Sequence, residues 1–245
     1  MVSVDSERTV LKVITSGAFA AALVELLQIY REKYSLEVQL AFGSSLGEAH
    51  DSIPTRLGNG EQFDLYFLAR PAIDDFTAQG FIRKGSGVDL VESHIGAMVR
   101  SEDPEPDIST AEALRETLLA SASVAHAASV SGIYMSTEVF PALGIADEMK
   151  KTARKILSER VGTVVARGDA DLGFQQISEI LPIKGVKVIG RLPEPFQRSF
   201  RFGVAMDAKT DNIEAAKHVM RFVASEEAAP IIRKTGLDPL FPTIG

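Results

Sequence analysis

The chain has 245 residues, of which 45% are apolar and 24% are charged, and its formal net charge is −7. This composition predicts a compact protein with one large or two moderate cores, and an acidic balance without any Lys/Arg run argues against nucleic acid or an anionic membrane as partner. Because the chain has no cysteine, disulfides, a thiolate nucleophile and a cysteine-based metal site are excluded.

The N-terminal segment predicts no targeting signal. Residues 1–9 are polar and lack the apolar region of a signal peptide, and no segment approaches 18 unbroken apolar residues. We therefore expect no direct membrane insertion. A start Met can replace a removed signal peptide, so the compartment stays open: periplasmic if such a peptide was removed, otherwise cytoplasmic.

Strand and helix patterns alternate along the first ninety or so residues. Residues 11–15 are typical of a buried strand, and residues 18–34 carry apolar side chains at the spacing of one helix face. Residues 38–42 and 63–68 predict two further strands, each followed by a helix or turn. Parallel pairing through crossover connections is the economical topology for this order.

A second α/β unit follows a surface loop rich in proline and acid at residues 101–107. Ser109 and Glu112 have the spacing of a capping box and predict the start of a helix that runs to residue 120. The remaining expected elements are a strand at 123–127, a helix at 132–143, apolar segments at 162–166 and 170–174, a strand at 202–206, and helices from Asn212 and Ser225.

Three apolar runs in the first unit end in small or polar residues. The segments that contain these run ends are "ITSGAF" (14–19), "FGSSLGEA" (42–49) and "DLYFLARP" (64–71). Strand ends and helix N-termini then form a site where unpaired backbone N–H groups and the helix dipole favour a bound anion. The sequence therefore predicts an anionic small ligand.

The order of these motifs, continued by "VSGIY", "VARGDADLGFQQ", "FGVAM" and "EEAAPIIRKTGLDP", resembles the molybdate-binding-protein-like family of type II periplasmic solute-binding proteins over nearly the whole chain. The resemblance implies a two-lobed α/β clamshell, each lobe a mostly parallel sheet flanked by helices, with ligand in the cleft and hinge closure. It implies residues 8–91 plus 203–245 as the first lobe and 92–202 as the second, joined by two crossover strands.

The chain departs from this family in its ligand residues. Receptors of the family hold a tetrahedral oxyanion with loop hydroxyls, backbone N–H groups and a tyrosine hydroxyl. The first-loop serine position falls on Ala18, the tyrosine position on Phe202, and a usually apolar position carries Gln175. Arg70 follows the third strand, and arginine binds carboxylates in bidentate fashion. This inventory favours a di- or tricarboxylate over a small tetrahedral anion.

Each candidate side chain also has a structural interpretation. Arg70 can pair with Asp74 or Asp75, and Ser44, Ser45 and Ser131 can act as helix caps. One of the two glutamines at 175 and 176 is expected to face the cleft and the other the protein. The predicted ligand-binding residues are Ser16, Gly17, Ala18, Ser44, Ser45, Arg70, Ser131, Gly132, Gln175, Gln176 and Phe202.

Neither a metal site nor a cofactor is predicted. The four histidines are scattered without metal-ligand spacing, and the chain has no P-loop, GxGxxG or GxSxG motif. His126 follows an expected strand and is the candidate general base if the protein is an enzyme, although a structural histidine is the more common case at such a position.

The sequence is compatible with two functions of different class. The first is a monomeric solute-binding protein for a small organic anion, which delivers its ligand to an ABC-type permease if it is exported. The second is a cofactor-independent isomerase, because relatives of this receptor family include aconitate isomerase, which moves a double bond by proton abstraction and return. Such chemistry needs donors for an enolate-like carboxylate and one acid/base group. Molybdate or tungstate binding comes third.

Overall fold

The computed structural model describes residues 10–34, 36–47, 49–157 and 159–245, so residues 8 and 9 of the predicted first lobe lie outside the described residues. Its strands join in one mixed sheet in the order β2-β1-β3-β9-β4-β7-β5-β6, with β8 and β10 also paired to β4. The strands are β1 (Val10–Thr15), β2 (Glu37–Phe42), β3 (Leu65–Ala69), β4 (Val88–Arg100), β5 (Val124–Ala127), β6 (Ala153–Ile156), β7 (Leu172–Gln176), β8 (Val186–Arg191), β9 (Ser199–Met206) and β10 (Asp238–Pro239).

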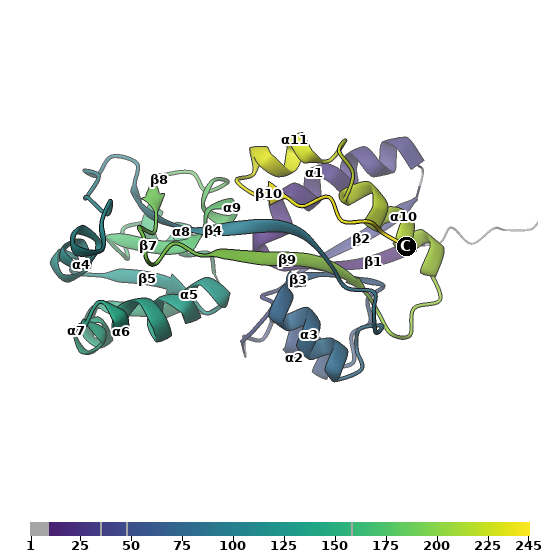
Figure 1. Ribbon diagram of the computed structural model, residues 1–245, viewed down its shortest axis with the longest axis horizontal. Coiled ribbons are helices and arrows are strands. Elements are labelled where there is room, and N and C mark those ends of the chain that lie inside the picture. The colour runs from purple at the N-terminus through teal and green to yellow at the C-terminus, as the bar shows by residue number, and fades with distance from the viewer. Residues whose placement is uncertain (1–9, 35, 48, 158) are drawn as a thin grey trace, which may run out of the picture.

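Helices cover both faces of this sheet (Figure 1). They are α1 (Gly17–Tyr34), α2 (Ile53–Gly58), α3 (Arg70–Ala78), α4 (Ala111–Ala120), α5 (Val130–Tyr134), the π-helical turn η1 (Met135–Val139), α6 (Phe140–Ala142), α7 (Ala146–Thr152), α8 (Val161–Ala166), α9 (Ile177–Ile180), α10 (Ile213–Val223) and α11 (Ala229–Lys234). Within the described residues, none of these helices has the length and apolar character needed to cross a membrane.

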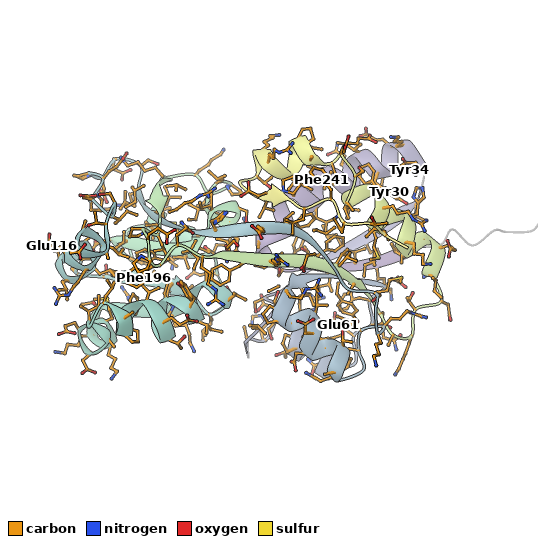
Figure 2. All side chains as sticks on the ribbon, in the orientation of Figure 1. Tyr30, Tyr34, Glu61, Glu116, Phe196 and Phe241 are labelled. Atoms are coloured by element: carbon orange, nitrogen blue, oxygen red, sulfur yellow. The ribbon has the colours of Figure 1, made fainter. Side chains whose placement is uncertain are left out.

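The first lobe is built on the parallel strands β2, β1 and β3. Helix α1 buries one face against them because Leu23, Leu26, Leu27 and Tyr30 recur at helical spacing and are all at most 1% exposed. Figure 1 shows α1, α10 and α11 on one side of this part of the sheet and α2 and α3 on the other. Figure 2 shows Tyr30 and Tyr34 of α1 at the end of the molecule opposite to Glu116.

The second lobe repeats this arrangement with β6, β5 and β7, whose pairing is also parallel. The structure corrects one detail of the sequence prediction for this lobe and specifies another. Helix α4 is capped by the Thr110 hydroxyl, which accepts a hydrogen bond from Ala113 N at 3.1 Å, so Ser109 is not the cap residue. The apolar segment at 162–166 is the helix α8, which packs its valines under β7.

Two long strands connect the lobes (Figure 1). β4 pairs with β9 from Val88 to His94 and then with β7 from Ile95 to Met98, both antiparallel. β9 pairs in turn with β3 in antiparallel direction. Parallel pairing is therefore confined to the outer strands, and the sheet as a whole is mixed because the connecting strands run in opposite directions.

The hydrophobic cores support the predicted lobe boundaries, which stay a prediction. One core draws its buried residues from the chain up to Val91 and from Phe202 onward, and a second draws its buried residues from Ile95 to Phe196. We propose on this ground that the lobes exchange along β4 and β9, as residues 8–91 plus 203–245 and 92–202 imply.

The close pairing of β9 with β4 depends on a glycine, Gly203. A Cβ atom added to Gly203 would lie 2.2 Å from the backbone oxygen of Val88 and 3.1 Å from Ile73. We expect Gly203→Ala to lower the free energy of unfolding by about 1–3 kcal/mol, the usual cost of overpacking, in urea titrations. The control is Gly58→Ala at the end of α2, where nothing lies within 4 Å of the added methyl group. Equal stability of the two variants would contradict the prediction.

Candidate functional site

A cavity of about 280 Å³ lies between the two lobes. Its walls are the loops that follow β1 and β2 in the first lobe and those that follow β5, β6 and β7 in the second. Among the predicted ligand residues, those that line it are Ser16, Gly17, Ala18, Ser44, Ser45, Gln175, Gln176 and Phe202. The structure brings these eight together from four separate segments, and their contact with a ligand stays a prediction.

The first loop places a hydroxyl and a helix N-terminus in the cavity wall. Strand β1 ends at Thr15 and α1 begins at Gly17, which lines the cavity. The first backbone N–H groups of α1, which have no partner within the helix, therefore lie at the cavity. Ser16 is 4% exposed, and its hydroxyl has no hydrogen-bond partner among the described residues. Ala18 contributes only a methyl group, as its sequence position implied.

The second loop places both predicted serines, Ser44 and Ser45, in the cavity wall. The alternative role of helix cap does not apply to them, because the next helix, α2, begins at Ile53 and is capped by Ser52. The Ser44 hydroxyl instead donates to Leu46 O at 2.7 Å, and the Ser45 hydroxyl accepts from Ala69 N at 3.1 Å. Both serines therefore fix loops in the cavity wall.

The two glutamines at the end of β7 both line the cavity and both have one fixed atom. Gln175 Oε1 accepts from Val161 N, the first residue of α8, at 3.1 Å. Gln176 Oε1 accepts from the Ser93 hydroxyl of β4 at 2.7 Å, whereas its Nε2 is buried without a partner among the described residues. The amide oxygens are thus held by protein, and the amide N–H groups are left as donors.

Arg70 lies outside the cavity wall. Its Nε donates to Asp89 Oδ1 at 2.5 Å, and its guanidinium also lies 3.5 Å from Asp74 Oδ1. The pairing of Arg70 with Asp74, which the sequence offered as the alternative, is what the structure has. The prediction of a carboxylate anchor at Arg70 finds no support in this geometry because Asp89 and Asp74 already occupy the guanidinium.

Ser131, Gly132 and His126 lie behind the wall rather than in it. Ser131 is fully buried in α5, and its hydroxyl has no partner in the described part of the chain. A Cβ atom on Gly132 would lie 1.6 Å from Ala127 O and 2.7 Å from His126 Nδ1, so this glycine allows α5 to pack against β5. The residues of this segment that line the cavity are Ala127, Ala128, Ser129 and Val130.

His126 has the surroundings of a structural histidine. It is 6% exposed, does not line the cavity, and has Nδ1 3.3 Å from Ala127 O. Burial, together with nearby Lys155, lowers the pKa of His126 below its ordinary value. The geometry gives no support to His126 as a general base.

Sequence reasoning missed Arg160, Glu159 and Glu179, all of which line the cavity. Arg160 precedes α8 and, among the described residues, has no carboxylate within ion-pair distance. Glu159 accepts two hydrogen bonds from Arg167, at 2.6 and 2.7 Å. Glu159 and Arg160 follow β6, a strand that the sequence patterns did not indicate, and Glu179 lies in α9 beyond the end of β7.

Glu179 lies against the N-terminus of α1. A Cβ atom on Gly17 would be 1.9 Å from Glu179 Oε1, so the carboxyl group occupies the space that the glycine leaves open. Burial raises the pKa of Glu179 to about 7, although Arg160 and a hydrogen bond from Gln175 act in the opposite direction. Glu179 therefore holds its proton more tightly than an exposed glutamate does.

Within the described residues, no group of three or more His, Asp or Glu side chains is arranged to hold a metal ion.

The comparison with protein families decides the affiliation of the chain. The family described as bacterial extracellular solute-binding protein matches residues 11–238. The chain belongs to this family. Among its relatives is an aconitate isomerase from a Pseudomonas species, which is 36% identical over 232 residues, or 95% of this chain and 88% of that protein.

Solved structures of solute-binding proteins have the same fold as this chain. The periplasmic molybdate-binding protein of Azotobacter vinelandii superposes with a TM-score of 0.72 at 19% identity and covers 95% of this chain and 100% of its own. The sulfate-binding protein of Mycobacterium tuberculosis has the same TM-score at 14% identity, covering 96% and 88%. The type II periplasmic-binding-protein fold and the family resemblance predicted from the sequence are confirmed.

The raised pKa of Glu179 implies that the free energy of unfolding depends on pH. The folded protein holds this proton more tightly than the unfolded chain, whose value is near 4.5. The resulting stabilisation is complete below pH 4.5 and is lost as pH rises through about 7. Glu179→Gln removes the titration, so its stability relative to the wild type should rise by about 1–3 kcal/mol between pH 4.5 and pH 8.

Urea titrations of both proteins at the two pH values measure this difference. Glu138→Gln is the control, since Glu138 is exposed on η1 and pairs with Arg198 outside the cavity. Parallel pH dependences of Glu179→Gln and the wild type would show that the folded state does not favour the Glu179 proton.

Proposed function

We propose that this protein is a cofactor-independent isomerase that moves a double bond within a small unsaturated di- or tricarboxylate bound between the lobes. The observation that carries the proposal is the 36% identity to an aconitate isomerase across 95% of this chain. The likeness to the molybdate- and sulfate-binding structures is below 20% identity and bears on the fold alone. The order of the two functions derived from the sequence is thereby reversed.

The donors of the cavity support a carboxylate as ligand. The Ser16 hydroxyl and Gln176 Nε2 are buried donors without a protein acceptor among the described residues, and burying such groups is costly unless a ligand satisfies them. The N-terminus of α1 adds backbone N–H groups and a positive dipole end. Arg160 supplies the planar fork that matches a carboxylate, the role first assigned to Arg70.

Binding without reaction is the second candidate function, and membership of the solute-binding family favours it. In that case the protein is a monomeric receptor that presents a carboxylate to an ABC-type permease. Molybdate or tungstate binding ranks below both, because Ala18 and Phe202 offer no hydroxyl and the Glu179 carboxyl lies at the helix N-terminus where an oxyanion would be held.

Proton NMR in D₂O separates reaction from binding. We expect the protein, incubated with cis- or trans-aconitate, to interconvert the two isomers and to introduce deuterium at the carbon that receives the proton. Heat-denatured protein is the control. A ligand that stabilises the protein in a thermal-shift assay and is returned unchanged and without deuterium would establish the receptor function instead.

The anchoring role of Arg160 is tested against Arg70. We expect Arg160→Ala to weaken binding of trans-aconitate by roughly 2–4 kcal/mol in isothermal titration calorimetry, because a buried ligand carboxylate loses its charged partner. Arg70→Ala is the matched control and should bind almost as the wild type does, since Arg70 is held by Asp89 outside the cavity. The reverse ranking would restore Arg70 as the anchor.

A further inference from the structure

We propose that Glu179 is the catalytic residue that removes and returns the proton, and that Gln175 is a positioning residue that holds the Glu179 carboxyl group at the N-terminus of α1. This inference rests on the proposed isomerase function and assigns its acid/base group. The sequence offered only His126 for this role, and the structure places His126 behind the cavity wall.

The charged side chains that face the cavity narrow the choice of acid/base group. They are Asp51 from the first lobe and Glu159, Arg160 and Glu179 from the second. The two hydrogen bonds from Arg167 lower the pKa of Glu159, so this carboxylate is a poor base. Arg160 is a permanent cation. Asp51 lies in the loop before α2, whereas Glu179 lies against Gly17, the first residue of α1.

The position of Glu179 is determined by three elements. Glu179 belongs to α9, which directly follows β7 and packs against α1. The absence of a side chain at Gly17 allows Oε1 to reach the α1 backbone, where a Cβ would lie only 1.9 Å away. The carboxyl group is therefore next to the cavity donors that would hold a substrate carboxylate.

Gln175 is the residue that we assign to position this carboxyl group. Because Gln175 Oε1 is occupied by the Val161 N–H of α8, its Nε2 is the atom left to donate to the Glu179 carboxyl group. This hydrogen bond opposes the rise in the pKa that burial causes. We assign to Gln175 the orientation of the Glu179 carboxyl group, which acts as a general base in its ionised form.

The reaction balances without any further reagent. The Glu179 carboxylate removes a proton from the substrate methylene beside the double bond, and the electron pair of that C–H bond forms the new double bond. The former double bond supplies the electron pair that takes the proton from the Glu179 carboxylic acid at its far carbon. Arg160, the Ser16 hydroxyl and Gln176 Nε2 bind the substrate carboxylates that share the negative charge between the two steps.

The test compares Glu179→Gln with the wild type and with Glu138→Gln. We expect kcat for aconitate isomerisation to fall 100- to 10,000-fold in Glu179→Gln, the usual contribution of a positioned acid/base group, while Kd for trans-aconitate changes less than about tenfold. Glu138→Gln should keep the wild-type kcat. Thermal unfolding confirms that each variant is folded before the rates are compared.

Gly17→Ala and Gln175→Leu make the test independent of one variant. Gly17→Ala places a methyl group on Glu179 Oε1 and should lower kcat at least tenfold with the carboxyl group still present. Gln175→Leu removes the hydrogen bond that lowers the pKa, so the rising limb of its pH–rate profile should move to higher pH. An effect of Gln175 on packing alone would leave that limb in place.

The outcomes distinguish the two proposals. Retention of kcat in Glu179→Gln, with the wild type active, would overturn the assignment of Glu179 and leave the isomerase function standing. Absence of both isomerisation and deuterium exchange in the wild type would overturn the isomerase function itself.

Discussion

The antiparallel pairing of β4 with β9 is the constraint on which the site depends. Both strands run through the two lobes, and between them they are paired to β3 on one side and β7 on the other. This arrangement brings the ends of the outer parallel strands in each lobe toward the same space. The ends of β1, β2, β5, β6 and β7 therefore meet at one cavity, although they come from distant parts of the chain.

The cavity combines the chemistry of an anion receptor with a feature that opposes it. The Ser16 hydroxyl and Gln176 Nε2 have no partner in the part of the chain that the structure describes, and with the α1 N-terminus and Arg160 they favour negative charge. The carboxyl group of Glu179 nevertheless lies among them. The Glu179 carboxylate and an anionic ligand beside it would raise each other's proton affinity, because like charges at short distance repel. A receptor for a fully ionised oxyanion gains nothing from such a group, whereas a site that passes a proton to and from its ligand requires one.

The fold was largely predictable from the sequence because its signals are local. Apolar runs and helical spacing identified β1, α1, β2, β3, β5 and the strand at 202–206, and the order of motifs indicated the two-lobed architecture. The cap of α4 was missed because Ser109 and Thr110 are adjacent and chemically equivalent, and only the backbone conformation selects Thr110. A short apolar segment such as 162–166 carries no period that separates strand from helix.

The site was predictable only in part, and the reason is physical. Ser16, Gly17 and the two glutamines were found because a strand end marks them. Arg70 has the same kind of position, but its guanidinium turns toward Asp89, a partner 19 residues away that no local pattern reveals. Glu179 depends on the fit between α9 and a glycine of α1, and such a contact between distant segments follows from tertiary packing alone.

The hydrogen bond between Ser93 and Gln176 has a mechanical consequence. Ser93 belongs to the connecting strand β4 just before its partner changes from β9 to β7, whereas Gln176 belongs to the cavity wall. A hinge motion that bends β4 at this point displaces the Ser93 hydroxyl and turns the Gln176 amide with it. In the function that we propose, a ligand bound to that amide would resist the same displacement. The angle between the lobes and the occupancy of the cavity would then be linked reciprocally through one side chain.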